Sequence, residues 1–165
     1  MHEIRIWRFL SAAALFGFAI ALVLVPQQAS SNSGQSADSP QSAVEKGVPA
    51  YHAQPPQGEL PATMDPKLFH NPLVQNAYTV AAKIKNTLYQ QPCYCHCDRS
   101  QGHTSLLDCF ASKHGSECGT CIKEDFYTYE QARKEKSATQ IRAGIVAGEW
   151  NRVDLAKYKR PLPEE

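Results

Sequence analysis

The chain has 165 residues, of which 17 are Lys or Arg and 16 are Asp or Glu, so its formal net charge is +1. This balance excludes the strong positive field of a typical nucleic-acid-binding protein and offers no general attraction to acidic partners. Both ends look non-globular, which leaves about 95 residues to fold, and a core that small gains much from a metal or covalent staple.

The N-terminus, residues 1–26, has the pattern of an export or anchoring segment. Arg5 and Arg8 precede an apolar run from Phe9 to Val25. At about 17 residues, this run exceeds the usual core of a signal peptide and just reaches the length of a transmembrane helix. We expect an uncleaved transmembrane anchor, with a cleaved signal peptide as the alternative. The positive-inside rule then places the rest of the chain on the extracytoplasmic, periplasmic side, or free as a secreted protein after cleavage.

Residues 27–62 are rich in Ser, Gln and Pro and lack apolar periodicity. This composition predicts a flexible, disordered linker. His52, which lies in it, is expected to be a solvated linker histidine without a chemical role. The folded domain is expected at residues 63–152, and residues 153–165 are expected to form a charged, frayed tail.

The domain is predicted to be all-α, a small bundle of about four short helices around a cysteine-rich loop and metal site. Asn71 followed by proline marks a helix start, and apolar residues at intervals of three and four continue to Leu88. Ser137 and Gln140 form a capping-box pattern for the last helix. The predicted helices span 71–88, 105–113, 119–134 and 137–150.

All six cysteines of the chain lie within one short segment. Their spacing is C-x-C-x-C, then a single cysteine, then C-x-x-C, which gives more thiols than one tetrahedral ion can use. Either several ions share the sulfurs, or some cysteines are paired as disulfides. The residues are Cys93, Cys95, Cys97, Cys109, Cys118 and Cys121.

The C-x-C-x-C part is predicted to lie on a loop after the first helix. If that loop is extended, its three thiols share one side at separations of roughly 6.6 Å, which is too far for an unstrained disulfide. Soft metal ions bind neighbouring thiolates without this constraint. Cys109 is expected to point inward from a short helix, and Cys118 and Cys121 open the next helix, where the helix dipole favours thiolates.

Other meanings of the C-x-x-C motif have less support. Haem attachment would need histidine after Cys121, where the chain has Ile122. A thioredoxin-like site would need a βαβ unit, and no strand pattern is visible. A zinc module usually combines two such ligand pairs, whereas this chain has one.

The stretch PCYCHC at 92–97, GHTSLLDCF at 102–110, the C-x-x-C at 118–121 and SATQIRAGI at 137–145 together resemble the bacterial PCYCGC-motif (CYCXC) family of exported proteins. The resemblance covers about residues 71–150 and implies an exported or membrane-attached protein with one functional cysteine site. His96 stands where the family usually has glycine. The cysteine that anchors lipoproteins of this family has no counterpart here, so that mode of attachment does not carry over.

The ligand types favour copper(I), since bridging thiolates allow one set of sulfurs to hold more than one ion, with zinc or an iron–sulfur cluster as alternatives. His103, His114 and His96 are secondary candidates as ligands or orienting groups. The sequence thus predicts a membrane-tethered copper(I)-thiolate protein for copper storage, delivery or electron transfer, with the membrane and a copper donor or acceptor protein as partners.

Two alternatives stay open at this point. Three disulfides could staple a structural or interaction domain, and the C-x-x-C could serve thiol–disulfide exchange. Enzyme chemistry has little support, because no catalytic motif stands out. Asp108, Glu117 and Asp125 are expected to be helix-end or surface charges.

Overall fold

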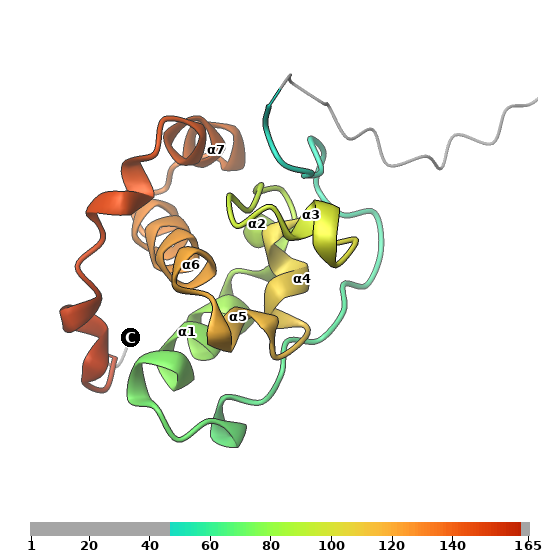
Figure 1. Cartoon of the computed structure of the whole chain (residues 1–165). Coiled ribbons are helices and arrows are strands. Elements are labelled where there is room, and N and C mark those ends of the chain that lie inside the picture. Colours follow the sequence, from blue (N-terminus) through green and yellow to red (C-terminus); the bar gives the residue numbers. More distant parts are fainter. Residues whose placement is uncertain (1–46, 163–165) are drawn as a thin grey trace, which may run out of the picture. The chain divides into compact units, whose positions relative to one another are not determined.

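The computed structural model describes residues 47–162, and every helix in that part is short or of moderate length (Figure 1). The predicted membrane segment 1–26, most of the predicted linker and residues 163–165 lie outside the described residues. Among residues 47–162 there is no strand, which confirms the all-α class. No helix in this range is long and apolar enough to serve as a membrane span.

The helices are α1 and α2, which follow the short 3-10 turn η1, then α3, α4 and α5 around the cysteines, and then α6 and α7. Two further 3-10 turns, η2 and η3, end the described chain. Their bounds are η1 Pro66–Leu68, α1 Pro72–Lys83, α2 Lys85–Leu88, α3 Cys97–Ser100, α4 Leu106–Phe110, α5 His114–Glu117, α6 Gly119–Ala132, α7 Ala138–Val146, η2 Glu149–Arg152 and η3 Leu155–Lys159.

The first helix begins as predicted but is divided. The Asn71 side chain accepts a hydrogen bond from Leu73 N at 3.0 Å, and Pro72 occupies the first helical position. At Ile84 the backbone leaves the α region (φ −115°, ψ 26°), so α1 and α2 replace the single helix expected to Leu88. The apolar spacing continues across this break and therefore did not reveal it.

Helix α6 is the central element, with α1, α4 and α7 packed around it (Figure 1). Its apolar residues Ile122 and Phe126 are buried, as are the polar residues Glu124, Asp125 and Thr128. Because α6 is covered on most of its surface, its first turn, which contains Cys121, lies in the interior of the domain. The central helix thus fixes one cysteine of the candidate site.

Helix α7 has the predicted capping box. Ser137 N donates to Gln140 Oε1 at 2.9 Å, and Gln140 N donates to Ser137 Oγ at 3.3 Å. The helix ends earlier than the expected Trp150, because Gly148 adopts a left-handed conformation (φ 75°) and η2 follows.

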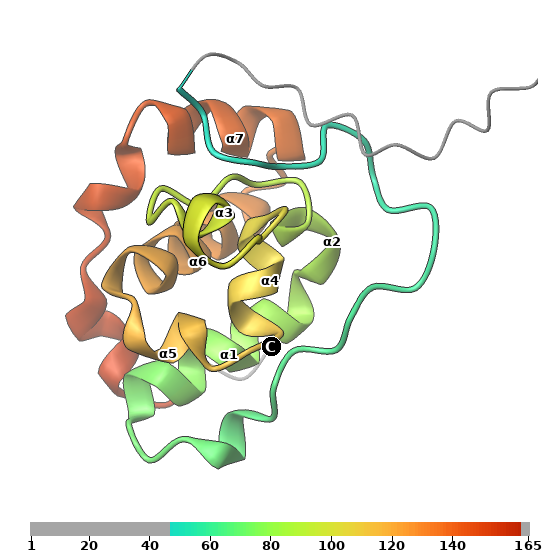
Figure 2. The ribbon, with the colours of Figure 1, turned by 45° about the vertical axis from the view of Figure 1, so that its right-hand side comes forward.

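The part of the expected linker that the structure describes packs against the domain. Tyr51 is buried, and the guanidinium carbon of Arg142 lies 4.5 Å from the centre of the Tyr51 ring. His52 is half-buried and stacks on Tyr89 at 3.8 Å, so it is not the solvated linker histidine that the sequence suggested. In Figure 2 this segment runs beside α7 and α3, and Ala50 N donates to the Asp98 carboxylate at 3.4 Å. The domain boundary at residue 63 stays a prediction.

The expected frayed tail is also wrong for the residues that the structure describes. Tyr158 is buried, stacks on Phe126 with ring centres 3.7 Å apart, and donates to Glu130 Oε1 at 2.7 Å. Asn76 of α1 donates to the backbone oxygens of Tyr158 and Arg160. These contacts depend on residues far away in the sequence, and the charged composition of the tail gave no sign of them.

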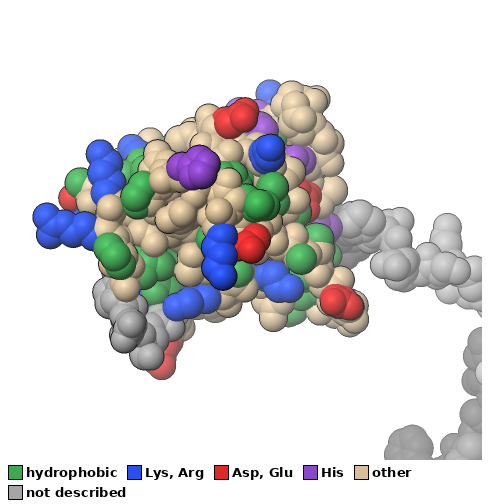
Figure 3. All heavy atoms as spheres, turned by 90° about the horizontal axis from the view of Figure 1, so that it is seen from below, with side chains coloured by type: hydrophobic (Ala, Val, Ile, Leu, Met, Phe, Trp, Pro, Cys, Tyr) green, Lys and Arg blue, Asp and Glu red, His purple; other side chains and the backbone are tan. Residues whose placement is uncertain are grey.

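On the face shown in Figure 3, basic and acidic side chains are interspersed, and near its centre one of each lies side by side. This distribution matches the near-neutral composition.

Candidate metal centre

The C-x-C-x-C segment forms a turn. His96 N donates to Cys93 O at 3.1 Å, and His96 adopts the left-handed conformation (φ 58°), after which Cys97 begins α3. The loop is therefore not extended, and the spacing argument that assumed an extended loop does not apply. Because the chain reverses, the sulfurs of Cys93 and Cys95 lie 3.3 Å apart instead of the roughly 6.6 Å of an extended strand.

Two other helices bring the remaining sulfurs to this turn. Cys109 lies in α4 and is fully buried, as predicted from its apolar neighbours. Asp108 fixes the start of α4, since its carboxylate accepts from Thr104 N at 2.6 Å and Ser105 N at 3.3 Å. Cys121 lies in the first turn of α6 and is also fully buried.

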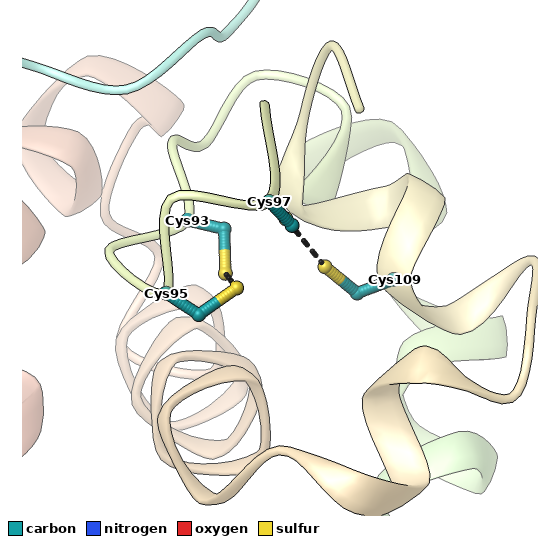
Figure 4. Close-up of side chains that lie close together, drawn as sticks. All are labelled: Cys93, Cys95, Cys97 and Cys109. Carbon is teal, nitrogen blue, oxygen red and sulfur yellow. Dashed lines mark hydrogen bonds between the residues drawn. The ribbon is translucent and has the colours of Figure 1, made fainter. Parts of the chain in front are cut away.

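The ligand atoms form two overlapping groups, each with four donors that lie within 4.8 Å of one another. We call Cys93, Cys95, Cys97 and Cys109 the inner group and Cys95, Cys109, His114 and Cys121 the rim group. Figure 4 shows the inner group, with Cys93 and Cys95 on the turn facing Cys97 and Cys109. Cys95 and Cys109 belong to both groups, so their sulfurs stand where bridging ligands between two ions would lie.

All six cysteines are free thiols. The sulfur of Cys93 lies 3.4 Å from that of Cys121, and Cys97 lies 3.4 Å from Cys109. These separations far exceed a disulfide bond of about 2.05 Å. They are close to the edge of a tetrahedron of sulfurs at about 2.3 Å from a common ion, which is roughly 3.8 Å. The cluster can therefore hold a metal ion.

The three histidines that are candidate ligands, His96, His103 and His114, occupy different environments. His114 Nε2 lies 3.6 Å from Cys95 Sγ and completes the rim group. His103 Nδ1 lies 3.1 Å from Cys97 Sγ and 3.4 Å from Cys109 Sγ, outside both groups but able to donate to those sulfurs. His96 faces Tyr94, with ring centres 6.0 Å apart, and joins neither group.

Cys118 also stands outside both groups. It is the N-cap of α6, and its sulfur accepts a hydrogen bond from Cys121 N at 3.4 Å. Its side chain is half-buried, whereas Cys121 is fully buried. The structure thus brings together five of the six predicted cysteines and His114, with His103 and Cys118 at the edges. Ligation of metal by these residues stays a prediction.

Hydrogen bonds between the sulfurs separate their acidities. Hydrogen bonding with Cys109 and Cys93 lowers the pKa of Cys97, and hydrogen bonding with Cys109 and Cys118 lowers the pKa of Cys121. Hydrogen bonding to Cys109 also lowers the pKa of Cys95. Hydrogen bonding within the cluster and burial raise the pKa values of Cys93, Cys109 and Cys118.

The cluster thus combines cysteines whose pKa is lowered with cysteines whose pKa is raised. Thiolates are the form of cysteine that binds metal, and an incoming ion displaces the remaining protons. The hydrogen bond to Cys95 raises the pKa of His114 above its ordinary value of 6.5. A protonated imidazole beside a thiolate must also lose its proton before it can bind an ion.

Two buried acidic residues lie behind the cluster, and the sequence reasoning missed both. Glu124 is fully buried, and its Oε1 accepts from Tyr94 N at 2.9 Å. Asp125 is fully buried with no hydrogen-bond partner for either oxygen, so the expectation of a surface charge is wrong. Burial raises the pKa of both carboxyl groups well above their usual range. Their place on the buried face of a helix, three and four residues after Cys121, is the signal that could have revealed them.

Asp108 and Glu117 lie where the sequence suggested, the first at the start of α4 and the second exposed at the end of α5.

Comparison with known families supports the motif-based resemblance. A family described as "Protein of unknown function with PCYCGC motif" matches residues 20–151, which include the whole cysteine cluster. No curated protein and no solved structure matches the chain. With most of its length matched and every cysteine of the cluster inside the match, this chain belongs to the PCYCGC-motif family.

Proposed function

We propose that the cluster holds two copper(I) ions bridged by Cys95 and Cys109, and that the protein receives and delivers copper outside the cytoplasm. The observation that carries the proposal is that two four-donor groups share two sulfurs. A single ion would use one of the groups, whereas two ions use both without any further donor. This sharing of donors supports a dinuclear centre.

The donor chemistry supports a soft ion. The two groups together contain five sulfurs and one imidazole nitrogen, with no carboxylate oxygen. Thiolates favour copper(I), zinc and iron–sulfur clusters over magnesium or calcium. Copper(I) is a soft ion, and thiolate ligands select it for that reason.

The size and exposure of the centre favour delivery over storage. Two ion positions give little capacity for a store. Cys95 and His114 are half-buried, while Cys93, Cys97, Cys109 and Cys121 are buried, so one side of the centre is accessible to a partner's ligands. The membrane tether and the extracytoplasmic location remain part of the proposal, and they rest on the arginines and apolar run of residues 1–26.

Metal analysis combined with thiol titration tests this function. The reduced full chain, loaded anaerobically with copper(I), is expected to retain two ions, and the five cysteines of the two groups become protected. Only Cys118 should then react with a thiol reagent. A chain that is isolated with no metal and with a mass deficit of paired thiols would show that disulfides are the native state instead.

Zinc is the second candidate, because each group offers four donors, the number that structural zinc sites use. Competition decides between them. A zinc-loaded chain treated with stoichiometric copper(I) is expected to release zinc, and the thiolate-to-copper absorption should rise in step with the zinc that is released. Retention of zinc under these conditions would assign a structural zinc centre.

A further inference from the structure

A hydrogen bond links the backbone of the turn that carries Cys93 and Cys95 to α6. The backbone N–H of Tyr94, between the two cysteines, donates to Glu124 Oε1 at 2.9 Å. Glu124 has no exposed surface. Because Glu124 is fully buried, loss of its carboxyl oxygen would remove this acceptor from the Tyr94 N–H.

The same helix supplies a sulfur to the cluster. Cys121 and Glu124 are three residues apart in α6 and therefore lie on the same face of the helix. The Cys93 sulfur lies 3.4 Å from that of Cys121. One helical face thus carries both a candidate ligand and the anchor for two others.

The Glu124 side chain is costly to bury. Its second oxygen, Oε2, is buried with no hydrogen-bond partner. A buried polar atom without a partner destabilises a fold, and an apolar residue would pack in this position without that cost. The other oxygen, Oε1, explains why a carboxyl group stands at this position, because it holds the turn that carries Cys93 and Cys95.

We infer that Glu124 is the positioning residue of the metal centre, which fixes the Tyr94 backbone so that Cys93 and Cys95 face Cys121. It acts through the turn and does not bind the ion. This role rests on the proposed metal-binding function. Loss of such an outer partner of metal ligands typically weakens metal binding about 10- to 100-fold.

Two matched substitutions of Glu124 separate the effect of side-chain length from the effect of the carboxyl group. Glu124→Gln keeps a carbonyl oxygen at the same distance from the helix, whereas Glu124→Asp keeps the carboxylate but is one methylene too short. In the full chain, titrated with copper(I) against a chelator, Glu124→Gln is expected to bind within about threefold of the native chain and Glu124→Asp about 10- to 100-fold more weakly. The opposite order would overturn the inference.

Asp125→Asn is the control, because Asp125 is equally buried on the same helix but has no hydrogen bond to the turn. It is expected to leave copper affinity unchanged. A loss as large as that of Glu124→Asp would show that general packing of α6 is responsible, and would overturn the positioning role.

Hydrogen exchange in the metal-free chain tests the anchor independently of copper. The Tyr94 amide is expected to exchange slowly in the native chain and in Glu124→Gln, and at least tenfold faster in Glu124→Asp. If the native chain binds no copper but shows this pattern, the proposed function fails and the anchor stands. Equal exchange rates in all three chains would overturn the anchor itself.

Discussion

The inner and rim groups share Cys95 and Cys109 but differ in how the rest of the fold holds them. The two ligands that are unique to the inner group, Cys93 and Cys97, are 3% and 1% exposed. The rim group adds Cys121 and His114, and His114 lies half-buried on a helix of four residues. In the proposed centre, the shared sulfurs of Cys95 and Cys109 connect a more buried ion position in the inner group to a more exposed ion position in the rim group.

This difference suggests that the two ions differ in how readily they exchange. Three of the four inner ligands, Cys93, Cys97 and Cys109, are buried, and such ligands lose little freedom when they bind. A half-buried imidazole on a short helix can leave and return, which opens a coordination position for a partner's ligand. We therefore expect the inner ion to be retained and the rim ion to exchange.

The bridging cysteines should have the largest effect. In Cys95→Ser and Cys109→Ser, each group loses a sulfur, because a hydroxyl is a poor ligand for a soft ion. Both ions are expected to bind at least about 100-fold more weakly, a loss of about 2.7 kcal/mol per ion. Stoichiometry and affinity, measured by competition with a copper(I) chelator, provide the check.

Cys95→Ser is the cleaner of these two variants, since its side chain is half-buried and the substitution disturbs little of the core. Loss of only one ion in this variant would contradict the bridge and separate the two groups.

Removal of a ligand that belongs to only one group should remove one ion. Cys97→Ser is expected to lower the stoichiometry from two ions to one, and the remaining ion should exchange quickly, since it occupies the rim group. Exchange can be followed by the rate at which a chelator removes copper. A single, slowly exchanging ion would reverse the assignment of the closed and open positions.

Substitution of His114 should weaken metal binding less than the cysteine substitutions above. His114→Ala removes one of four donors of the rim group, so the rim ion is expected to bind about 10-fold more weakly while the inner ion is unchanged. Because the pKa of His114 is raised by Cys95, protons compete with metal for this imidazole at a higher pH than for an ordinary histidine.

Acidification through that pKa should weaken the rim ion of the native chain more steeply than that of His114→Ala. Binding curves measured at several pH values compare the two chains. Identical pH dependence would remove His114 from the group.

Much of the fold could be predicted from local patterns. The caps at Asn71 and Ser137 and the apolar spacing located the main helices, since these signals depend on neighbouring residues. The break at Ile84 leaves the apolar spacing intact and so has no local sign. The packing of Tyr51 and Tyr158 depends on contacts between distant segments. Composition alone made those segments look like a linker and a tail.

The site shows the same limit. The crowding of thiols predicted that one cluster would form, and the inward direction of Cys109 followed from its helical neighbours. The sharing of Cys95 and Cys109 could not be predicted, because it requires the turn at His96 and the meeting of three helices. Glu124 was missed because a charged residue on a helix is usually exposed, and only its Tyr94 contact gives it a role.

Substitution of Cys118 should have the smallest effect on metal binding. It tests whether the rim group is limited to the four donors assigned to it. Cys118 belongs to neither group, and its sulfur accepts from Cys121 N as the N-cap of α6. Serine is a good N-cap residue, so Cys118→Ser preserves that hydrogen bond while it removes a soft ligand. The variant is expected to keep two ions, to change the free energy of unfolding by less than about 0.5 kcal/mol, and to lose the one thiol that reacts in the loaded native chain. If an ion is lost instead, Cys118 belongs to the rim group, and the open position is held by more sulfur than the present geometry assigns to it.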